Sequence, residues 1–102
     1  MAYLHGLMVV LTMATTAQGG ETQPVEFVAH RGESADAPEN TMPAFNLAWG
    51  RGVKAIELDV HLSRDGVLVV AHDADMKRVA GSDLKIKDST WDQLKGLDVG
   101  RW

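Results

Sequence analysis

Two histidines of this 102-residue sequence lie at positions where they could act in catalysis. His30 directly follows the apolar run Val25–Ala29, and His72 directly follows the apolar run Val67–Ala71. Because imidazole titrates near neutral pH, two histidines at strand ends suit a general acid and a general base. A single histidine at a strand end is more often structural, so the interpretation depends on the neighbouring residues.

A pair of carboxylates lies between the histidines, on the alternating stretch Val53–Leu62. Glu57 and Asp59 are two residues apart, so a continuous strand would hold them on one face about 6–7 Å apart. Two like charges at that distance repel each other unless a cation or protons intervene. Carboxylate oxygens are the ligands that a hard divalent cation, Ca²⁺ or Mg²⁺, favours. The alternative is a solvated outer sheet face that carries Glu57, Asp59 and His61 without any metal.

Arg31 adds a third kind of group, because it follows His30 directly. Its planar guanidinium offers two parallel donors to phosphate oxygens. Histidines, acids and arginine together predict metal-assisted chemistry on a phosphate ester, at a site built from strand ends. Sites at the carboxyl ends of strands are typical of β/α barrels.

The elements that would position these groups can be read along the chain. The run Val25–Ala29 predicts a strand and Glu33–Asn40 a loop. A helix should begin at Asn40 or Thr41, since both are good N-caps and Pro43 would fall in the first turn. Its expected apolar stripe is Met42, Phe45 and Trp49, and its end is expected at Gly50 and Gly52.

The second half of the chain predicts fewer regular elements. Val53–Leu62 alternates as one strand, and Asp65-Gly66 is a turn. Val67–Ala71 does not alternate, which predicts a strand covered on both faces. Residues 73–102 are expected to form a loop with one short helical piece at 91–97.

Composition excludes several classes of protein. Ten basic and 14 acidic residues give a net charge of −4, which argues against a nucleic-acid partner. The absence of cysteine excludes a disulfide scaffold, a thiolate metal site and a cysteine nucleophile. No apolar run reaches the roughly 18 residues of a membrane span. The chain is long enough for one small domain.

The start of the chain differs from the remainder. Residues 1–20 contain no charged side chain, and an apolar stretch from Leu7 to Ala14 precedes small residues around Ala17. This order is typical of a secretory signal peptide and predicts a secreted or periplasmic protein. Residues 21–24 would be a linker before a domain over 25–102. The alternative is that the first 20 residues form a buried strand or helix of the domain.

Five short motifs, in this order and spacing, resemble the glycerophosphodiester phosphodiesterase family. They are His30-Arg31-Gly32, Pro38-Glu39-Asn40-Thr41, Glu57-Leu58-Asp59-Val60, Asp65-Gly66 and His72-Asp73. The resemblance extends from about Val25 to Trp102. It implies an α/β fold, the N-terminal portion of a (β/α)₈ TIM-type barrel that stops after about three strands. Since such a barrel takes at least about 200 residues, the chain by itself is expected to be inactive.

The resemblance also implies a reaction and its residues. The reaction is metal-dependent hydrolysis of a glycerophosphodiester to glycerol 3-phosphate and an alcohol, with Ca²⁺ or Mg²⁺ as the cofactor. The catalytic histidines would be His30 and His72, the phosphate ligand Arg31, and two metal ligands Glu57 and Asp59. The family's third acidic ligand has no counterpart in these 102 residues. Glu39 is expected to brace its loop or to touch the metal site, and His61 is left outside the machinery.

Two other kinds of protein remain alternatives. One is a barrel enzyme of the phosphatidylinositol phospholipase C or sphingomyelinase D type, which shares paired histidines and acidic metal ligands. The other is a non-catalytic binding module on the same scaffold. The released alcohol and the oligomeric state are left open by the sequence.

Overall fold

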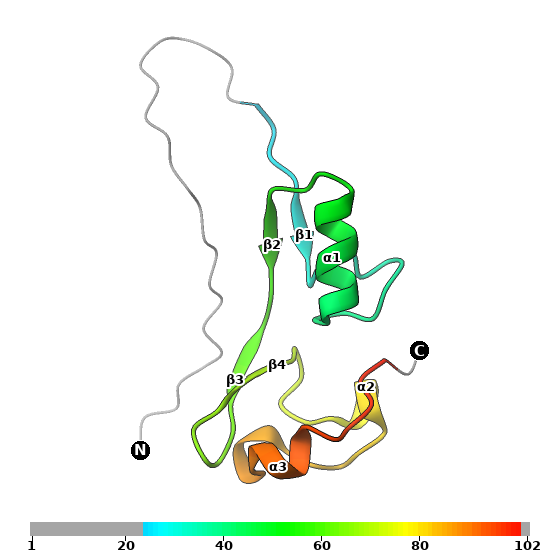
Figure 1. Cartoon of the computed structure of the whole chain (residues 1–102). Helices are drawn as coiled ribbons and strands as arrows, with labels where there is room; N and C mark the ends of the chain where they lie inside the picture. Colours follow the sequence, from blue (N-terminus) through cyan, green and yellow to red (C-terminus); the bar gives the residue numbers. More distant parts are fainter. Residues whose placement is uncertain (1–23, 101–102) are drawn as a thin grey trace, which may run out of the picture.

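The computed structural model describes residues 24–100, so the expected signal peptide and most of the linker lie outside the described residues. The elements are, in chain order, β1 (Val28–His30), α1 (Met42–Gly50), β2 (Ala55–Glu57), β3 (Val60–Leu62), β4 (Leu68–Val70), α2 (Lys77–Ala80), the 3-10 turn η1 (Ile86–Asp88) and α3 (Trp91–Leu94) (Figure 1). Within this range no helix has the length and apolar character to cross a bilayer.

The first half of the described chain is a β-α-β unit. β1 and β2 pair in parallel, with His30 opposite Glu57, and α1 is the crossover between them. A parallel pair needs such a connection because its strands run in the same direction. The α/β character predicted from the sequence is therefore confirmed for this part of the chain.

Helix α1 begins and ends where the sequence predicts. The Thr41 hydroxyl accepts from the amide of Ala44 at 3.4 Å, Pro43 lies in the first turn, and the chain leaves the helix through Gly52 at φ +80°. The predicted apolar stripe is wrong in two of its three positions. Phe45 is buried together with the alanines at 44 and 48, whereas Met42 and Trp49 are exposed.

The small side chains set which face of α1 is buried. A Cβ on Gly32 would lie 2.8 Å from the carbonyl carbon and from the Cβ of Ala44. The loop after β1 therefore approaches the helix backbone closely at Ala44, where a glycine in the loop and an alanine in the helix leave room for the contact. The larger Met42 and Trp49 point elsewhere, which the period of apolar residues alone does not show.

The single strand predicted over Val53–Leu62 is divided. β2 ends at Glu57 and pairs with β1, whereas β3 begins at Val60 and pairs antiparallel with β4. Between them the amide of Asp59 donates to the side-chain oxygen of Asn40 at 3.3 Å, so this amide has a partner outside any strand ladder. The expectation that one continuous face carries Glu57, Asp59 and His61 is corrected accordingly.

The β3–β4 hairpin turns where expected. The Ser63 amide donates to the Val67 carbonyl at 2.9 Å, and Gly66 takes φ +84° within the turn. The prediction that β4 is covered on both faces is wrong for the described residues. Val69 is buried, but its neighbours Leu68 and Val70 are exposed.

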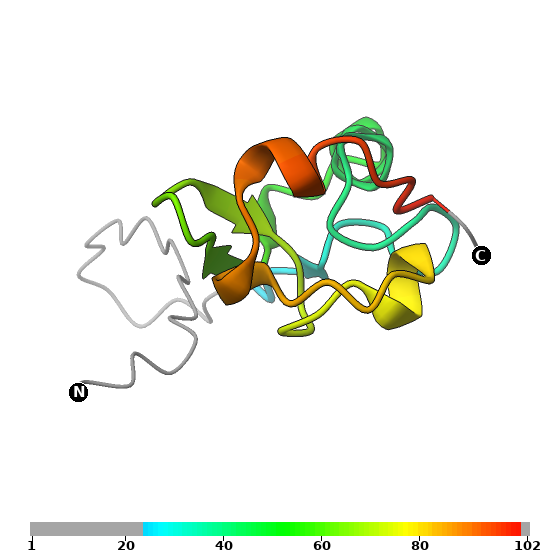
Figure 2. The ribbon, with the colours of Figure 1, turned by 90° about the horizontal axis from the view of Figure 1, so that it is seen from below.

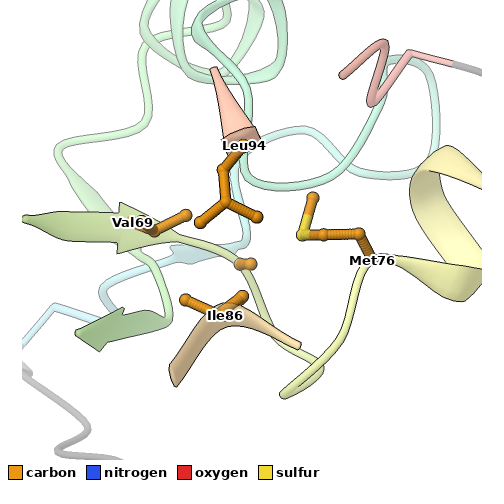
Figure 3. Close-up of a cluster of buried hydrophobic side chains, with 5 residues drawn as sticks. Val69, Met76, Ile86 and Leu94 are labelled. Atoms are coloured by element: carbon orange, nitrogen blue, oxygen red, sulfur yellow. The ribbon is translucent and has the colours of Figure 1, made fainter. Parts of the chain in front are cut away.

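The chain after β4 holds three short helical pieces, α2, η1 and α3, where one was predicted. Side chains from β4, η1 and α3, and from the chain between β4 and α2, meet in an apolar cluster that fixes this segment (Figure 3). The cluster consists of Val69, Ala71, Met76, Ile86 and Leu94. α2 and α3 stand apart in the view from below (Figure 2), and the cluster ties both to the end of β4.

Candidate active site

The strand ends bring the candidate residues together by two connections. The parallel pairing of β1 with β2 places His30 opposite Glu57, with Nε2 3.8 Å from Oε2. The hairpin then returns the chain, and the Ala71 amide donates to the carbonyl of Asp59 at 3.0 Å. His72, the next residue, therefore lies at the edge that Glu57 and Asp59 occupy. Both histidines are open to solvent, with side chains 69% and 45% exposed.

Arg31 lies at the centre of this edge. Its amide donates to the Glu57 side chain at 3.2 Å, and its Nη1 lies 3.4 Å from both oxygens of Glu39. Its Nε lies 3.4 Å from Oδ2 of Asp59, within ion-pair distance. That Nε is nevertheless buried without a hydrogen-bond acceptor among the described residues, because distance alone does not make a hydrogen bond.

Glu39, which was expected to brace its loop or to touch the metal site, lies between two arginine side chains. Its carboxylate binds Arg31 and, from the other side, the guanidinium of Arg78 at 2.7 and 2.9 Å. The Arg78 hydrogen bonds, with help from Arg31, lower the pKa of Glu39 although burial opposes this. Glu39 is thus held as a carboxylate between two guanidinium groups.

His72 has its own carboxylate partner, which the sequence analysis did not assign to the site. Its Nδ1 lies 2.7 Å from Oδ1 of Asp73. Asp73 in turn accepts from Nε of Arg78 at 2.8 Å. Arg78 first, and His72 second, lower the pKa of Asp73 to about 2. At neutral pH Asp73 is therefore ionised and can only accept hydrogen bonds. Nδ1 of His72 must then carry the proton in the hydrogen bond between the two side chains.

Three further residues of this edge escaped the sequence analysis as site components: Asn40, Asp73 and Arg78. Asn40 is buried at φ +57° and donates to Oδ2 of Asp59 at 3.0 Å. An Asp followed by Arg five positions later was the available signal for the Asp73–Arg78 pair, and that spacing is common. His61 contacts the edge too, since its Nε2 lies 3.0 Å from the carbonyl oxygen of His72.

A pocket opens beside these groups. Its lining includes the polar residues Glu39, Asn40, His72 and Asp73 and the apolar residues Met76 and Val79. The pocket therefore adjoins the Asp73 partner of His72 as well as the loop that carries Glu39 and Asn40.

Glu57 and Asp59 have the donor chemistry of a hard-cation site but not the full number of ligands. Glu57 is buried, and both residues offer carboxylate oxygens. Among residues 24–100, however, no group of three or more acidic or histidine side chains is arranged to hold a metal ion. The residues present fit such a cation in kind, as two of its ligands.

Comparison with known proteins decides the family. The sequence pattern of the glycerophosphoryl diester phosphodiesterase family matches residues 30–102. The chain belongs to this family. A glycerophosphodiester phosphodiesterase of Caldanaerobacter subterraneus is 47% identical over 73 residues, which are 72% of this chain and 30% of that protein. Glycerophosphodiester phosphodiesterase 1 of Bos taurus is 38% identical over 74 residues, 72% of this chain and 22% of that protein.

Solved structures of phosphodiesterases also match this chain. The glycerophosphodiester phosphodiesterase of Thermotoga maritima matches with a TM-score of 0.67 at 48% identity, over 72% of this chain and 33% of that one. An Oleispira antarctica phosphodiesterase in complex with the product sn-glycerol-3-phosphate matches with a TM-score of 0.71 at 42% identity, over 74% of this chain and 31% of that one. These neighbours are TIM-barrel enzymes. The chain spans about a third of their length, and neither alternative enzyme type is favoured.

Proposed function

We propose that this chain contributes the histidine, arginine and carboxylate part of an enzyme that hydrolyses glycerophosphodiesters to glycerol 3-phosphate and an alcohol. The observation that carries the proposal is that the strand ends bring the candidate acid–base, phosphate-binding and metal-binding residues to one edge, namely His30, Arg31, Glu57, Asp59 and His72. The Arg31 side chain lies within ion-pair distance of Asp59, and its backbone amide donates to the Glu57 side chain. A phosphate oxygen is the acceptor that a guanidinium suits best.

The two histidines would share the proton transfers. The lone pair on Nε2 of His72 is left free when Nδ1 donates to Asp73, so His72 suits the general base. It would take the proton from the attacking oxygen, of water or of the glycerol 2-hydroxyl. His30, beside Glu57, suits the general acid that protonates the leaving alkoxide. Arg31 would stabilise charge on the non-bridging oxygens.

Glu57 and Asp59 would hold the divalent cation, Ca²⁺ or Mg²⁺. Without positive charge between them, these carboxylates would repel a phosphodiester that approaches Arg31. The cation, when bound, supplies that charge and polarises the phosphoryl group. Asn40 keeps Asp59 oriented through hydrogen bonds at both its side chain and its amide.

The test uses a hybrid enzyme, in which residues 28–102 of this chain replace the aligned segment of the Thermotoga maritima relative. The hybrid is incubated with glycerophosphocholine, glycerophosphoethanolamine or glycerophosphoglycerol in the presence of Ca²⁺ or Mg²⁺. We expect release of glycerol 3-phosphate, which distinguishes this reaction from that of a phospholipase C. A folded hybrid that releases none refutes the proposal. The 102-residue chain, assayed alone, should be inactive.

We also propose that the protein is exported, on the basis of the uncharged residues 1–20 and the small residues around Ala17. The mature protein should lose roughly its first 17–20 residues, as judged from signal-peptide anatomy. N-terminal sequencing tests this, and a mature protein that still begins at Met1 or Ala2 contradicts it.

A further inference from the structure

Arg78 makes the most extensive side-chain contacts of the candidate active site. Its guanidinium donates to both oxygens of Glu39, from Nη2 at 2.7 Å and from Nη1 at 2.9 Å. It also donates to both oxygens of Asp73, from Nε at 2.8 Å and from Nη2 at 3.3 Å. One planar group therefore orients two carboxylates that are 34 residues apart in the sequence.

The first arm of this arrangement, defined as the contacts from Arg78 through Asp73, connects Arg78 with His72. Arg78 donates to both carboxylate oxygens of Asp73, and these two hydrogen bonds fix the orientation of the carboxylate. The same Oδ1 accepts from Nδ1 of His72 at 2.7 Å. Arg78 thus fixes the carboxylate that determines which imidazole nitrogen carries the proton.

The other arm leads to Arg31. Glu39 receives Arg78 on one side and lies 3.4 Å from Nη1 of Arg31 on the other. The Glu39 side chain as a whole is mostly shielded from water, with 19% of it exposed. The two arms connect the end of β1 with the end of β4 through a single guanidinium.

We propose that Arg78 is a positioning residue, which fixes the imidazole of His72 through Asp73 and aligns Arg31 with it through Glu39. This inference rests on the proposed function. A purely structural role fits less well, because α2 packs against the apolar cluster through Val79 and Ala80, whereas the Arg78 side chain is 49% exposed.

The kinetic test uses Arg78→Gln and Arg78→Lys in the hybrid enzyme. Arg78→Gln should lower kcat by about 10- to 100-fold, as expected when a catalytic group is misplaced by up to about 1 Å. Arg78→Lys should recover part of this loss, because an ammonium restores the charge but not the fork. Both variants should melt within about 4 °C of the parent. Lys77→Gln is the matched control on the same helix, where it removes the exposed pair with Asp83 at 2.6 Å, and kcat should stay within about twofold.

A double variant separates positioning through Asp73 from an independent effect. If Arg78 acts on His72 through Asp73, then Arg78→Gln together with Asp73→Asn should lose no more than about twofold beyond the worse single variant. Multiplied losses, an unchanged kcat in Arg78→Gln, or a loss of kcat explained by unfolding would each overturn the proposal.

The second readout does not depend on activity. In the full 102-residue chain with ¹⁵N-labelled histidine, above the titration range of imidazole, His72 should be in the Nδ1–H form. In Arg78→Gln it should show a mixture of both tautomers, and in Lys77→Gln it should not change. A mixture already present in the parent, or unchanged shifts in Arg78→Gln, overturns the proposal. A hybrid without diesterase activity would refute the proposed function, while the tautomer still decides the role of Arg78.

Discussion

The main-chain amide of Arg31 donates to two oxygens of Glu57, the carbonyl at 3.0 Å and the side-chain Oε2 at 3.2 Å. The end of the β1–β2 ladder and the orientation of a candidate metal ligand are therefore set by one N–H group. This geometry requires Arg31 at φ +59°, followed by Gly32 at φ +80°. Two successive left-handed residues turn the chain sharply from β1 toward α1.

The turn after β1 gives the first prediction, on stability. Gly32→Ala places a Cβ 2.8 Å from Ala44 and 2.9 Å from the Phe45 ring in addition to the strain of its positive φ. Gly52→Ala is the matched control, since Gly52 has φ +80° as well but no atom within 4 Å of the added Cβ. Gly32→Ala should cost about 1–3 kcal/mol more than the control, the usual cost of overpacking. Urea unfolding of the hybrid enzyme measures both, and equal losses would contradict the close approach.

The second prediction concerns the divalent cation. A chelator should abolish the activity of the hybrid enzyme, and Ca²⁺ or Mg²⁺ should restore it, because Glu57 and Asp59 repel the phosphodiester otherwise. Asp59→Asn should raise the cation concentration needed for half-maximal activity, while the fold survives. Asp36→Asn is the control: it removes an acid paired with Arg51 at 2.6 Å, away from the site. Full activity in excess chelator would contradict the assignment.

The sequence predicted the β-α-β unit and its helix limits because local signals determine them. Thr41, Pro43 and Gly52 act within one turn of the helix ends, so their effect does not depend on distant residues. The division of the strand at Asp59 could not be predicted in the same way. It depends on the side chain of Asn40, 19 residues earlier, and on two different pairing partners.

The candidate site shows the same limit. The sequence motifs identified the candidate site residues His30, Arg31, Glu57, Asp59 and His72, and the structure brings their positions to one edge. Arg78 was missed because nothing in its neighbourhood marks it. It reaches Glu39 across 39 residues, and only the path of the chain after β4 makes that contact.

The third prediction concerns the two histidines. His30→Ala and His72→Ala should each lower kcat of the hybrid enzyme by about 10²- to 10⁴-fold, the range for the loss of a positioned acid or base. The combined loss should be far from additive, because both act in one reaction. Melting temperatures should change little, since both side chains are largely exposed. His61→Ala is the comparison, because it removes only the contact with the His72 carbonyl, and a wild-type kcat in either catalytic variant would exclude that histidine.

The fourth prediction is a pH dependence. Hydrogen bonds from Arg78 and then from His72 hold the pKa of Asp73 at about 2, below its ordinary value of 3.8. A carboxyl whose pKa is depressed in the folded state stabilises the fold above its unfolded pKa. The contribution of Asp73 is therefore complete above about pH 4, shrinks as the pH falls toward 2, and is lost below that value.

Carboxyl ¹³C shifts of Asp73 in an acid titration measure this pKa directly. Arg78→Gln should raise the midpoint toward 3.8, and His72→Ala should raise it less, because the arginine is the larger cause of the shift. Asp65 serves as the internal reference, since the Ser63 hydroxyl and the Trp91 amide lower its pKa independently of Arg78. Its midpoint should be the same in all three proteins. A parent midpoint near 3.8 for Asp73 would mean that Arg78 does not hold this carboxylate in solution, and the coupling of His72 to Glu39 would lose its physical basis.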